Sequence, residues 1–362
     1  MSENLIFLAG KSALSKIKAE GLRPDMVKII AGAAGGPKWL VLSHLDRLIF
    51  SSWLKTRASQ APVFLIGSSI GAWRFAAVSR RDPMTAIEKF QSAYLSQSYS
   101  SSPTPEDVTL EMTKAMNSFL DDRGIREILE HPYLRLNIMA VRCKGLVASD
   151  KKIPLMLGMA GAALSNTVRR NFLKSFFERT LFYDPRQIPP FFEMNGFPIQ
   201  RTPLTHHNIR GALLASGSIP AVMLGVNDIP GTQAGTYRDG GIIDYHFDIP
   251  FMKKGEEGIV LFPHYTDRII PGWLDKRLTW RKPMSSNMDH VLLVSPSKTF
   301  IDRLPFHKIP DREDFRRFQS RDKERVAYWN TVIRKSRRLG EEFLEVTQTG
   351  KIRELVKPVP VR

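Results

Sequence analysis

The chain of 362 residues contains 43% hydrophobic and 25% charged residues, which excludes a disordered chain, a collagen-like repeat and a small scaffold held by cross-links. Its single cysteine, Cys143, allows neither an internal disulfide nor a cysteine-rich zinc site. Basic residues, in excess toward both ends, leave a formal charge of +17, which suits nucleic acid, anionic lipid, an acidic partner or a plain solvated surface.

The N-terminal stretch and the apolar runs bear on where the protein resides. The first ten residues, MSENLIFLAG, lack the basic start and the long apolar stretch of a secretory signal. The longest apolar run, Ile153 to Leu164, is shorter than the roughly 18 residues that span a bilayer. We therefore expect a globular protein of the cytoplasm, which would touch a membrane only at its surface.

Two strand–turn–helix units open the predicted fold. Residues 26–31 form a short β-branched strand that runs into a glycine-rich turn and an apolar helical pattern over 40–49. Residues 62–66 repeat this order, and the second helix stops before Asp82 and Pro83. Such units predict a parallel sheet with helices on its faces.

The remaining elements follow in the same style. We expect helices within 84–130 separated by a polar loop at 98–107, a strand at 136–142, one or two helices over 153–183, strands at 258–262 and 290–294, and one charged helix over 311–345 with Phe315, Phe318, Val326, Trp329 and Phe343 facing inward. The predicted fold class is α/β, with a three-layer α/β/α core and a mainly parallel sheet. We expect one domain over 26–255, and a C-terminal extension of strands and a charged helix over 256–362.

The first motif that suggests chemistry is GSSIG, residues 67–71, between the second strand and its helix. In a G-x-S-x-G turn the serine, here Ser69, projects its hydroxyl clear of the sheet. Gly67 and Gly71 permit the strained backbone of this nucleophile elbow, and the helix N-terminus at Ile70 would stabilise a developing anion. The pattern favours a nucleophilic serine, although a plain Gly/Ser turn has the same letters.

The second motif is the glycine-rich turn over residues 32–38, GAAGGPK. A phosphate-binding P-loop would need glycine where Pro37 stands and a hydroxyl where Trp39 stands. A dinucleotide-binding fingerprint would need glycine in place of Ala34. Both nucleotide-binding readings therefore fail.

An oxyanion loop remains for this turn. Small residues let backbone N–H groups converge on one spot, and a nearby cation adds to the field there. Gly35 and Gly36 would supply such N–H groups and Lys38 the cation. A tight turn that caps the following helix is the alternative.

The third motif is the aspartate and glycine pair in YRDGGIID, residues 237–244, which supplies Asp239. Taken alone, an aspartate before two glycines is usually a turn. It gains weight because the first two motifs call for a base.

Taken in order, the three motifs resemble those of the patatin-like phospholipase family, whose members carry a glycine-rich oxyanion loop with Arg or Lys, a G-x-S-x-G serine and a D-G-[GA] aspartate. The segments ALLASGSIPAVM at 212–223 and DGGIIDYHFDIP at 239–250 are also similar to that family, and the resemblance covers residues 26–252. The loop departs from the usual GGGxRG pattern, since it reads AGGPKW, with a proline that has no N–H and a lysine in place of arginine.

The resemblance implies a serine acyl hydrolase that cleaves phospholipids or related lipid esters. Ser69 would be the nucleophile and Asp239 the general base, with no histidine and no cofactor. The acyl-enzyme would then be resolved by water. A dry site would raise the pKa of the aspartate toward useful basicity.

Two alternatives stay open. A Ser–His–Asp triad of the α/β-hydrolase kind needs a histidine after the acid, and four follow it: His246, His264, His290 and His307. A catalytically silent, membrane-associated binding protein could keep the same fold. No metal is expected, because the neighbouring His206 and His207 point apart and lack a carboxylate at ligand spacing.

Residues 151–183 interleave apolar, aromatic and basic side chains. An interfacial helix would lay Phe172, Phe176 and Phe177 into lipid and set Arg169, Arg170 and Lys174 against phosphates. A core helix with basic residues at its ends is the alternative interpretation of the same sequence. No nucleic-acid partner is expected, because no recognition motif accompanies the basic residues, and the oligomeric state is left open.

Overall fold

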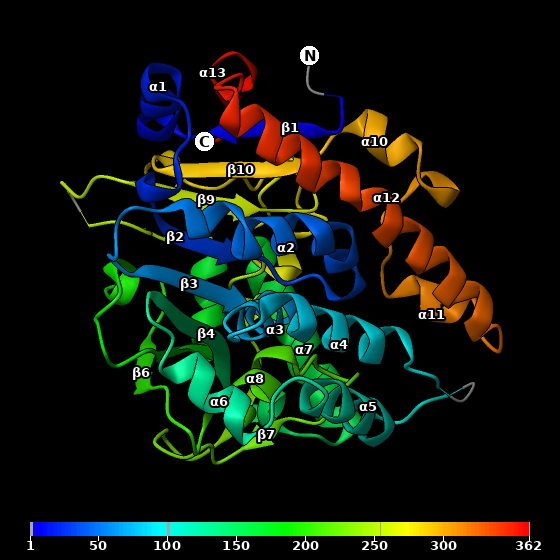
Figure 1. Ribbon diagram of the computed structural model, residues 1–362. Helices are drawn as coiled ribbons and strands as arrows, with labels where there is room; N and C mark the ends of the chain where they lie inside the picture. Colours follow the sequence, from blue (N-terminus) through cyan, green and yellow to red (C-terminus); the bar gives the residue numbers. More distant parts are fainter. Residues whose placement is uncertain (1–2, 100–101, 254, 362) are drawn as a thin grey trace.

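One mixed, mostly parallel sheet flanked by helices dominates the computed structural model, which describes residues 3–99, 102–253 and 255–361 (Figure 1). Residues 1–2 of the N-terminal stretch and residues 100–101 of the predicted polar loop lie outside these ranges, as do Lys254 and Arg362, which fall within the two predicted domains.

The strands are β1 (Leu5–Ala9), β2 (Val27–Gly32), β3 (Val63–Ser68), β4 (Leu134–Cys143), β5 (Phe177–Tyr183), β6 (Ile199–Pro203), β7 (Val226–Asn227), β8 (Thr236–Asp239), β9 (Ile259–Pro263), β10 (Val291–Pro296) and β11 (Lys357–Pro358). The α-helices are α1 (Lys11–Glu20), α2 (Ser43–Ser51), α3 (Ile70–Val78), α4 (Pro83–Leu95), α5 (Pro105–Asn117), α6 (Asp122–Leu129), α7 (Lys152–Val168), α8 (Ile209–Gly217), α9 (Ser285–Met288), α10 (Lys298–Asp302), α11 (Glu313–Arg317), α12 (Asp322–Gln348) and α13 (Ile352–Leu355). Short 3₁₀ turns that matter below are η2 (Gly36–Leu42), η4 (Gly145–Ala148), η5 (Arg170–Ser175), η7 (Gly240–Ile242) and η8 (Trp273–Asp275).

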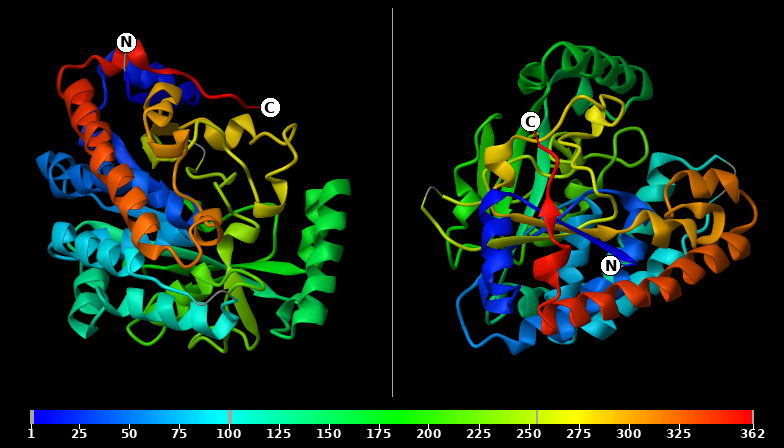
Figure 2. Two further views of the ribbon diagram at one scale, coloured as in Figure 1. Left: turned by 90° about the vertical axis from the view of Figure 1, so that its right-hand side faces the viewer. Right: turned by 90° about the horizontal axis from the view of Figure 1, so that it is seen from above.

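The sheet order is β11-β1-β10-β9-β2-β3-β4-β5-β6, and parallel pairs predominate. Strands β3, β9 and β10 are buried along their whole length, as expected for parallel strands covered on both faces. Helices α2, α3, α4 and α12 cover one face, and α7 stands on the opposite side (Figures 1 and 2). The predicted three-layer α/β/α class is confirmed.

The first two strand–turn–helix units lie where the sequence predicts them. Strand β2 leads into η2 and α2, and β3 leads directly into α3. The predicted helices within 84–130 are α4, α5 and α6, and the predicted strands at 136–142, 258–262 and 290–294 are β4, β9 and β10. Strands β9 and β10 belong to the same sheet as β2, so the predicted extension over 256–362 adds strands to the central sheet. The boundary near residue 255 stays a proposal.

Two predictions of secondary structure are wrong. Residues 177–183 form strand β5 instead of the end of a helix, because they pair antiparallel with β4 over the register Cys143↔Phe177 to Ile138↔Phe182. The charged tail helix is broken into α11 and α12. The buried carboxylate of Asp314 in α11 holds the two pieces together, since it accepts from the indole of Trp329 in α12 at 3.0 Å.

The inward residues predicted for the tail are mostly correct. Trp329 and Phe343 are fully buried and Phe318 is nearly so, whereas Phe315 and Val326 are only half-buried. Cys143 is buried and carries a free thiol.

Candidate active site

Ser69 occupies a strained turn between β3 and α3. Its φ is +54°, a region that L-residues with side chains rarely adopt, and its N–H donates to the Ser216 hydroxyl at 2.8 Å. The flanking glycines are required by close approach: a Cβ on Gly67 would lie 2.4 Å from the Ala72 nitrogen, and one on Gly71 would lie 2.0 Å from the Gly32 oxygen. Gly67 and Gly71 therefore let α3 press against the end of the sheet beneath the serine.

Strand β4 brings Ser69 and Asp239 together. The end of β3 pairs parallel with β4, with Ser68 opposite Met139. The end of β8 pairs antiparallel with β4, with Asp239 opposite Ala140. Strands β3 and β8 thus run toward each other beside β4, and their C-terminal ends meet at two consecutive residues of that strand.

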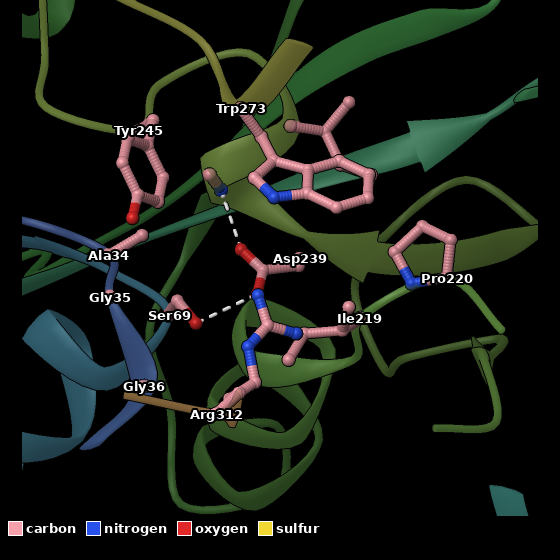
Figure 3. A pocket seen from close by; sticks show the side chains of 12 residues that line it. Ala34, Gly35, Gly36, Ser69, Ile219, Pro220, Asp239, Tyr245, Trp273 and Arg312 are labelled. Carbon is pink, nitrogen blue, oxygen red and sulfur yellow. Dashed lines mark hydrogen bonds between the residues drawn. The ribbon is translucent and has the colours of Figure 1, made fainter. Parts of the chain in front are cut away.

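The two side chains form a hydrogen-bonded pair (Figure 3). The Ser69 hydroxyl donates to Asp239 Oδ2 at 2.7 Å, and the Gly241 N–H donates to Oδ1 at 2.7 Å. Burial raises the pKa of Asp239 to about 6 from an ordinary value near 3.8, although both hydrogen bonds and the charges of Arg312 and Lys276 act in the opposite direction. The carboxylate is therefore a stronger base than a solvated aspartate, yet still ionised at neutral pH.

The glycines after Asp239 are needed for space. A Cβ on Gly240 would lie 2.3 Å from the Met139 oxygen, and one on Gly241 would lie 2.7 Å from the Ala34 side chain. The turn η7 thus packs between β4 and the glycine-rich loop. This contact sets the loop beside the Ser69–Asp239 pair.

The glycine-rich loop borders the serine through Ala34, Gly35 and Gly36. The Ala34 N–H already donates to the Tyr245 carbonyl at 2.9 Å, and Pro37 has no N–H. Gly35 and Gly36 remain as the loop's candidate oxyanion donors, and Ile70 at the start of α3 lines the adjoining cavity.

Lys38 lies apart from the predicted site. Its ammonium sits 4.9 Å from the ring centroid of Tyr265, and burial lowers its pKa. Tyr265 supports the loop from behind, since its hydroxyl donates to the Ala34 carbonyl at 2.5 Å. Lys38 is not among the residues that line the cavities at Ser69.

The cation that does border the serine is Arg312, from the segment before α11. Its side chain reaches across the cavity in front of the pair (Figure 3), packs near Gly36, and its guanidinium has no hydrogen-bond partner among the described residues. A second cation, Lys276, lies 4.3 Å from the ring centroid of Tyr245, and burial together with the charges of Lys38 and Arg312 lowers its pKa to about 7. The sequence motifs pointed to neither residue.

A cavity of about 480 Å³ adjoins Ser69, which is one of its lining residues. Its walls are mostly apolar and include Ile70, Trp73, Tyr94, Met112, Ile219, Val222, Met223, Trp273 and Phe315. The contributors Ile219 to Met223 belong to the ALLASGSIPAVM segment, so that resemblance could have suggested them. Phe315 comes from the predicted charged helix over 311–345, whose inward residues include it, whereas Trp273 comes from a segment with no recognisable pattern.

The four candidate histidines of a triad are engaged elsewhere. His246 bonds to the Tyr265 hydroxyl at 2.7 Å, and His264 accepts from the Thr266 N–H. Burial lowers the pKa of both rings, which keeps them neutral. His290 and His307 lie near the carbonyls of Gly258 and Asp302. None of the four bonds to Ser69 or Asp239.

Metal ligands do not gather anywhere in the described part of the chain. No group of three or more His, Cys, Asp or Glu side chains there is arranged to hold an ion. His206 and His207 belong to no such group.

No protein-family model matches the chain, and no curated protein matches it. Among solved structures it is similar to human GIVD cytosolic phospholipase A2, with a TM-score of 0.39 and 10% identity over 94% of this chain and 63% of that one. The chain thus spans less than two thirds of the length of that protein.

Proposed function

We propose that the chain is a serine acyl hydrolase that cleaves esters of long-chain acyl groups through Ser69 and Asp239. The observation that carries the proposal is the 2.7 Å hydrogen bond from the Ser69 hydroxyl to the buried Asp239 carboxylate, with Ser69 in the wall of an apolar cavity. A hydroxyl with a base in hydrogen-bond reach is the arrangement that nucleophilic catalysis needs.

The reaction follows from these contacts. The Ser69 oxygen attacks the ester carbonyl while its proton passes to Asp239, and the oxyanion would accept from the N–H groups of Gly35, Gly36 and Ile70. Collapse breaks the ester bond, and Asp239 returns the proton to the departing alcohol. Water, deprotonated by Asp239, then attacks the acyl-enzyme, and the acid leaves with Ser69 restored.

The lining and volume of the cavity, and the cation beside Ser69, indicate the substrate class. Apolar walls suit a hydrocarbon chain, and a volume of about 480 Å³ lies within the range of roughly 300–1,000 Å³ that ligand sites occupy. The unpaired guanidinium of Arg312 beside the serine suits an anionic group such as the phosphate of a phospholipid. We therefore propose phospholipids or related anionic lipid esters as substrates.

Labelling with a fluorophosphonate probe tests the proposal, because the probe forms a covalent bond only with an activated serine. The native chain should be labelled and Ser69→Ala should not. Ser68→Ala is the matched control: Ser68 is fully buried and its hydroxyl lacks a hydrogen-bond partner among the described residues, so labelling should persist.

Two results would count against the hydrolase. Labelling that survives in Ser69→Ala but disappears in Ser68→Ala would mean that the motif has been misassigned. A native protein that binds phospholipid but neither reacts with the probe nor releases fatty acid from mixed phospholipid vesicles would be a silent binding protein.

A further inference from the structure

Helix α7 turns apolar side chains toward solvent. Its five large exposed residues recur at helical spacing, and two more extend the same region from the 3₁₀ turns on either side; they are between 49% and 78% exposed: Ile153, Met156, Leu157, Leu164, Val168, Leu146 and Phe172. A surface helix normally directs such residues inward. Large exposed apolar residues gathered on one helix in this way are typical of an interaction site.

The opposite face of α7 fixes the helix rigidly to the protein. A Cβ on Gly158 would lie 2.8 Å from the Val147 nitrogen, so the helix touches the backbone of η4. The Asn166 amide donates to Asp275 in η8 at 2.7 Å. The apolar face is therefore presented on a firm support.

The distribution of charge around α7 is also unusual. Lys151, Lys152, Arg169 and Lys174 are exposed at the two ends of the helix, and the segment 151–177 contains no acidic residue. Lysines at a helix N-terminus oppose the helix dipole, which favours negative charge there. An anionic ligand would remove that cost.

We propose that α7, with Leu146 and Phe172 beside it, is a docking surface for an anionic lipid bilayer. The helix would lie in the plane of the interface, with its apolar face among the upper acyl chains and its terminal lysines and arginine against phosphates. Among the described residues no helix has the length and apolar character needed to cross a bilayer. A second copy fits less well, because cations at both helix ends would face cations in either orientation.

The docking surface and the Ser69 cavity are connected through shared neighbouring residues. Asp275 holds α7, and in the same turn Trp273 lines the cavity at Ser69. Arg238, next to Asp239, donates to the carbonyls of Val147 at 3.3 Å and Met223 at 3.2 Å. The docking surface is therefore held by η8, the turn that also contributes Trp273 to the cavity wall.

The sequence suggested more contacts here than exist. Phe177 is fully buried in β5 and Phe176 is half-buried, so Phe172 alone of the three can enter lipid. Arg170 lies 3.3 Å from Asp275 and donates to the Ile243 carbonyl at 2.5 Å, which makes it a structural residue. Arg169 and Lys174 remain as lipid contacts at this end.

Flotation with vesicles tests the inference without relying on catalysis. All measurements use the Ser69→Ala chain, with vesicles of phosphatidylcholine alone or mixed with phosphatidylglycerol, at low and high salt. Binding should require phosphatidylglycerol and weaken with salt. Ile153→Glu, Leu157→Glu and Leu164→Glu together should reduce the apparent affinity by a factor on the order of 100, because charged side chains replace those that enter the acyl region.

A charge-matched control separates docking from net charge. Met84→Glu, Leu110→Glu and Ile188→Glu alter exposed apolar residues outside α7 and should change binding by less than about threefold, as net charge acts only weakly at a distance. Equal losses in the two triple variants, or unaltered binding in the α7 variant, would overturn the inference. So would a native dimer in sedimentation equilibrium that the α7 substitutions convert to monomer. Failure of probe labelling alone would remove the proposed chemistry and leave the docking result standing.

Discussion

The Ser69 turn and helix α7 depart from ordinary packing in opposite ways. At the turn, an ionisable carboxylate, Asp239, lies in the interior and the backbone is strained at Ser69. On α7, large apolar side chains lie in solvent and lysines occupy the unfavourable end of the helix. Each arrangement costs free energy that a purely structural element would avoid.

The Ser69 turn and the outer face of α7 should therefore differ in how well they tolerate mutation. The turn depends on space, because its glycines touch backbone atoms that cannot move aside. The large apolar residues on the outer face of α7 are between 51% and 78% exposed, so their replacement should cost little folding free energy. Four experiments can break or sharpen this contrast.

The largest effect should come from Asp239→Asn. An amide cannot take the serine proton, so hydrolysis of a soluble ester should fall by a factor on the order of 10⁴, the loss seen when a catalytic base is disabled. The measurement is the initial rate at pH 8 on protein whose unfolding curve is normal. His246→Gln, His264→Gln, His290→Gln and His307→Gln should each keep most of the activity; one of them failing as badly as Asp239→Asn would restore the triad.

Replacing a glycine by alanine should lower the free energy of unfolding at the Ser69 turn and raise it in α7. Gly71→Ala places a Cβ 2.0 Å from a backbone oxygen and should lower the free energy of unfolding by about 3 kcal/mol. Gly161→Ala in α7 meets only the Phe176 ring, at 3.6 Å, and should raise it by about 0.5–1 kcal/mol through helix propensity. Urea unfolding measures both, and a stable Gly71→Ala would show that the turn is looser than its contacts indicate.

The third experiment compares the effects on stability of replacing two neighbouring arginines, Arg169 and Arg170. Arg170→Gln removes the donor to the Ile243 carbonyl and the cation beside Asp275, and should cost about 2 kcal/mol of stability. Arg169→Gln changes an exposed residue and should stay within about 0.5 kcal/mol. If the two variants unfold at the same urea concentration, Arg170 must be assigned to the lipid-facing set instead.

The smallest effect concerns pH. Because the pKa of Asp239 is raised to about 6 and only the ionised carboxylate acts as base, activity should rise with pH through about 6 and level off above it. The Arg312 charge lowers that pKa, so Arg312→Gln should move the rising limb to higher pH, while Arg312→Lys should leave it near its native position. An unmoved limb in Arg312→Gln would mean that the guanidinium does not act on the dyad.

Those parts of the fold and of the site that local sequence motifs determine could be predicted from the sequence. GSSIG and DGG each specify a turn by their own glycines, and the alternation of buried strands and helices specifies the α/β class. The prediction for residues 177–183 is wrong because their mixture of aromatic, apolar and charged residues continues the composition of 153–176, and only pairing with β4 makes the segment a strand.

Other features depend on contacts that no local pattern encodes. Arg312 and Trp273 reach the cavity from segments without a motif, and the Arg312 side chain packs against Gly36 of the glycine-rich loop. The apolar run of α7 was visible, yet its periodicity could not tell which side faces the protein. Asn166, bonded to Asp275, and Gly158, pressed against Val147, settle that orientation.

The meeting of β3 and β8 beside β4 has a consequence for how this site can change. Side chains alternate between the two faces of a strand, so a slip of one residue between β4 and β8 would send the carboxylate to the wrong side of the sheet. The segments between these strands are not bound by this alternation of side chains. They can lengthen, shorten or be replaced, altering the acyl cavity and the lipid-facing helix, while the geometry of Ser69 and Asp239 is inherited unchanged.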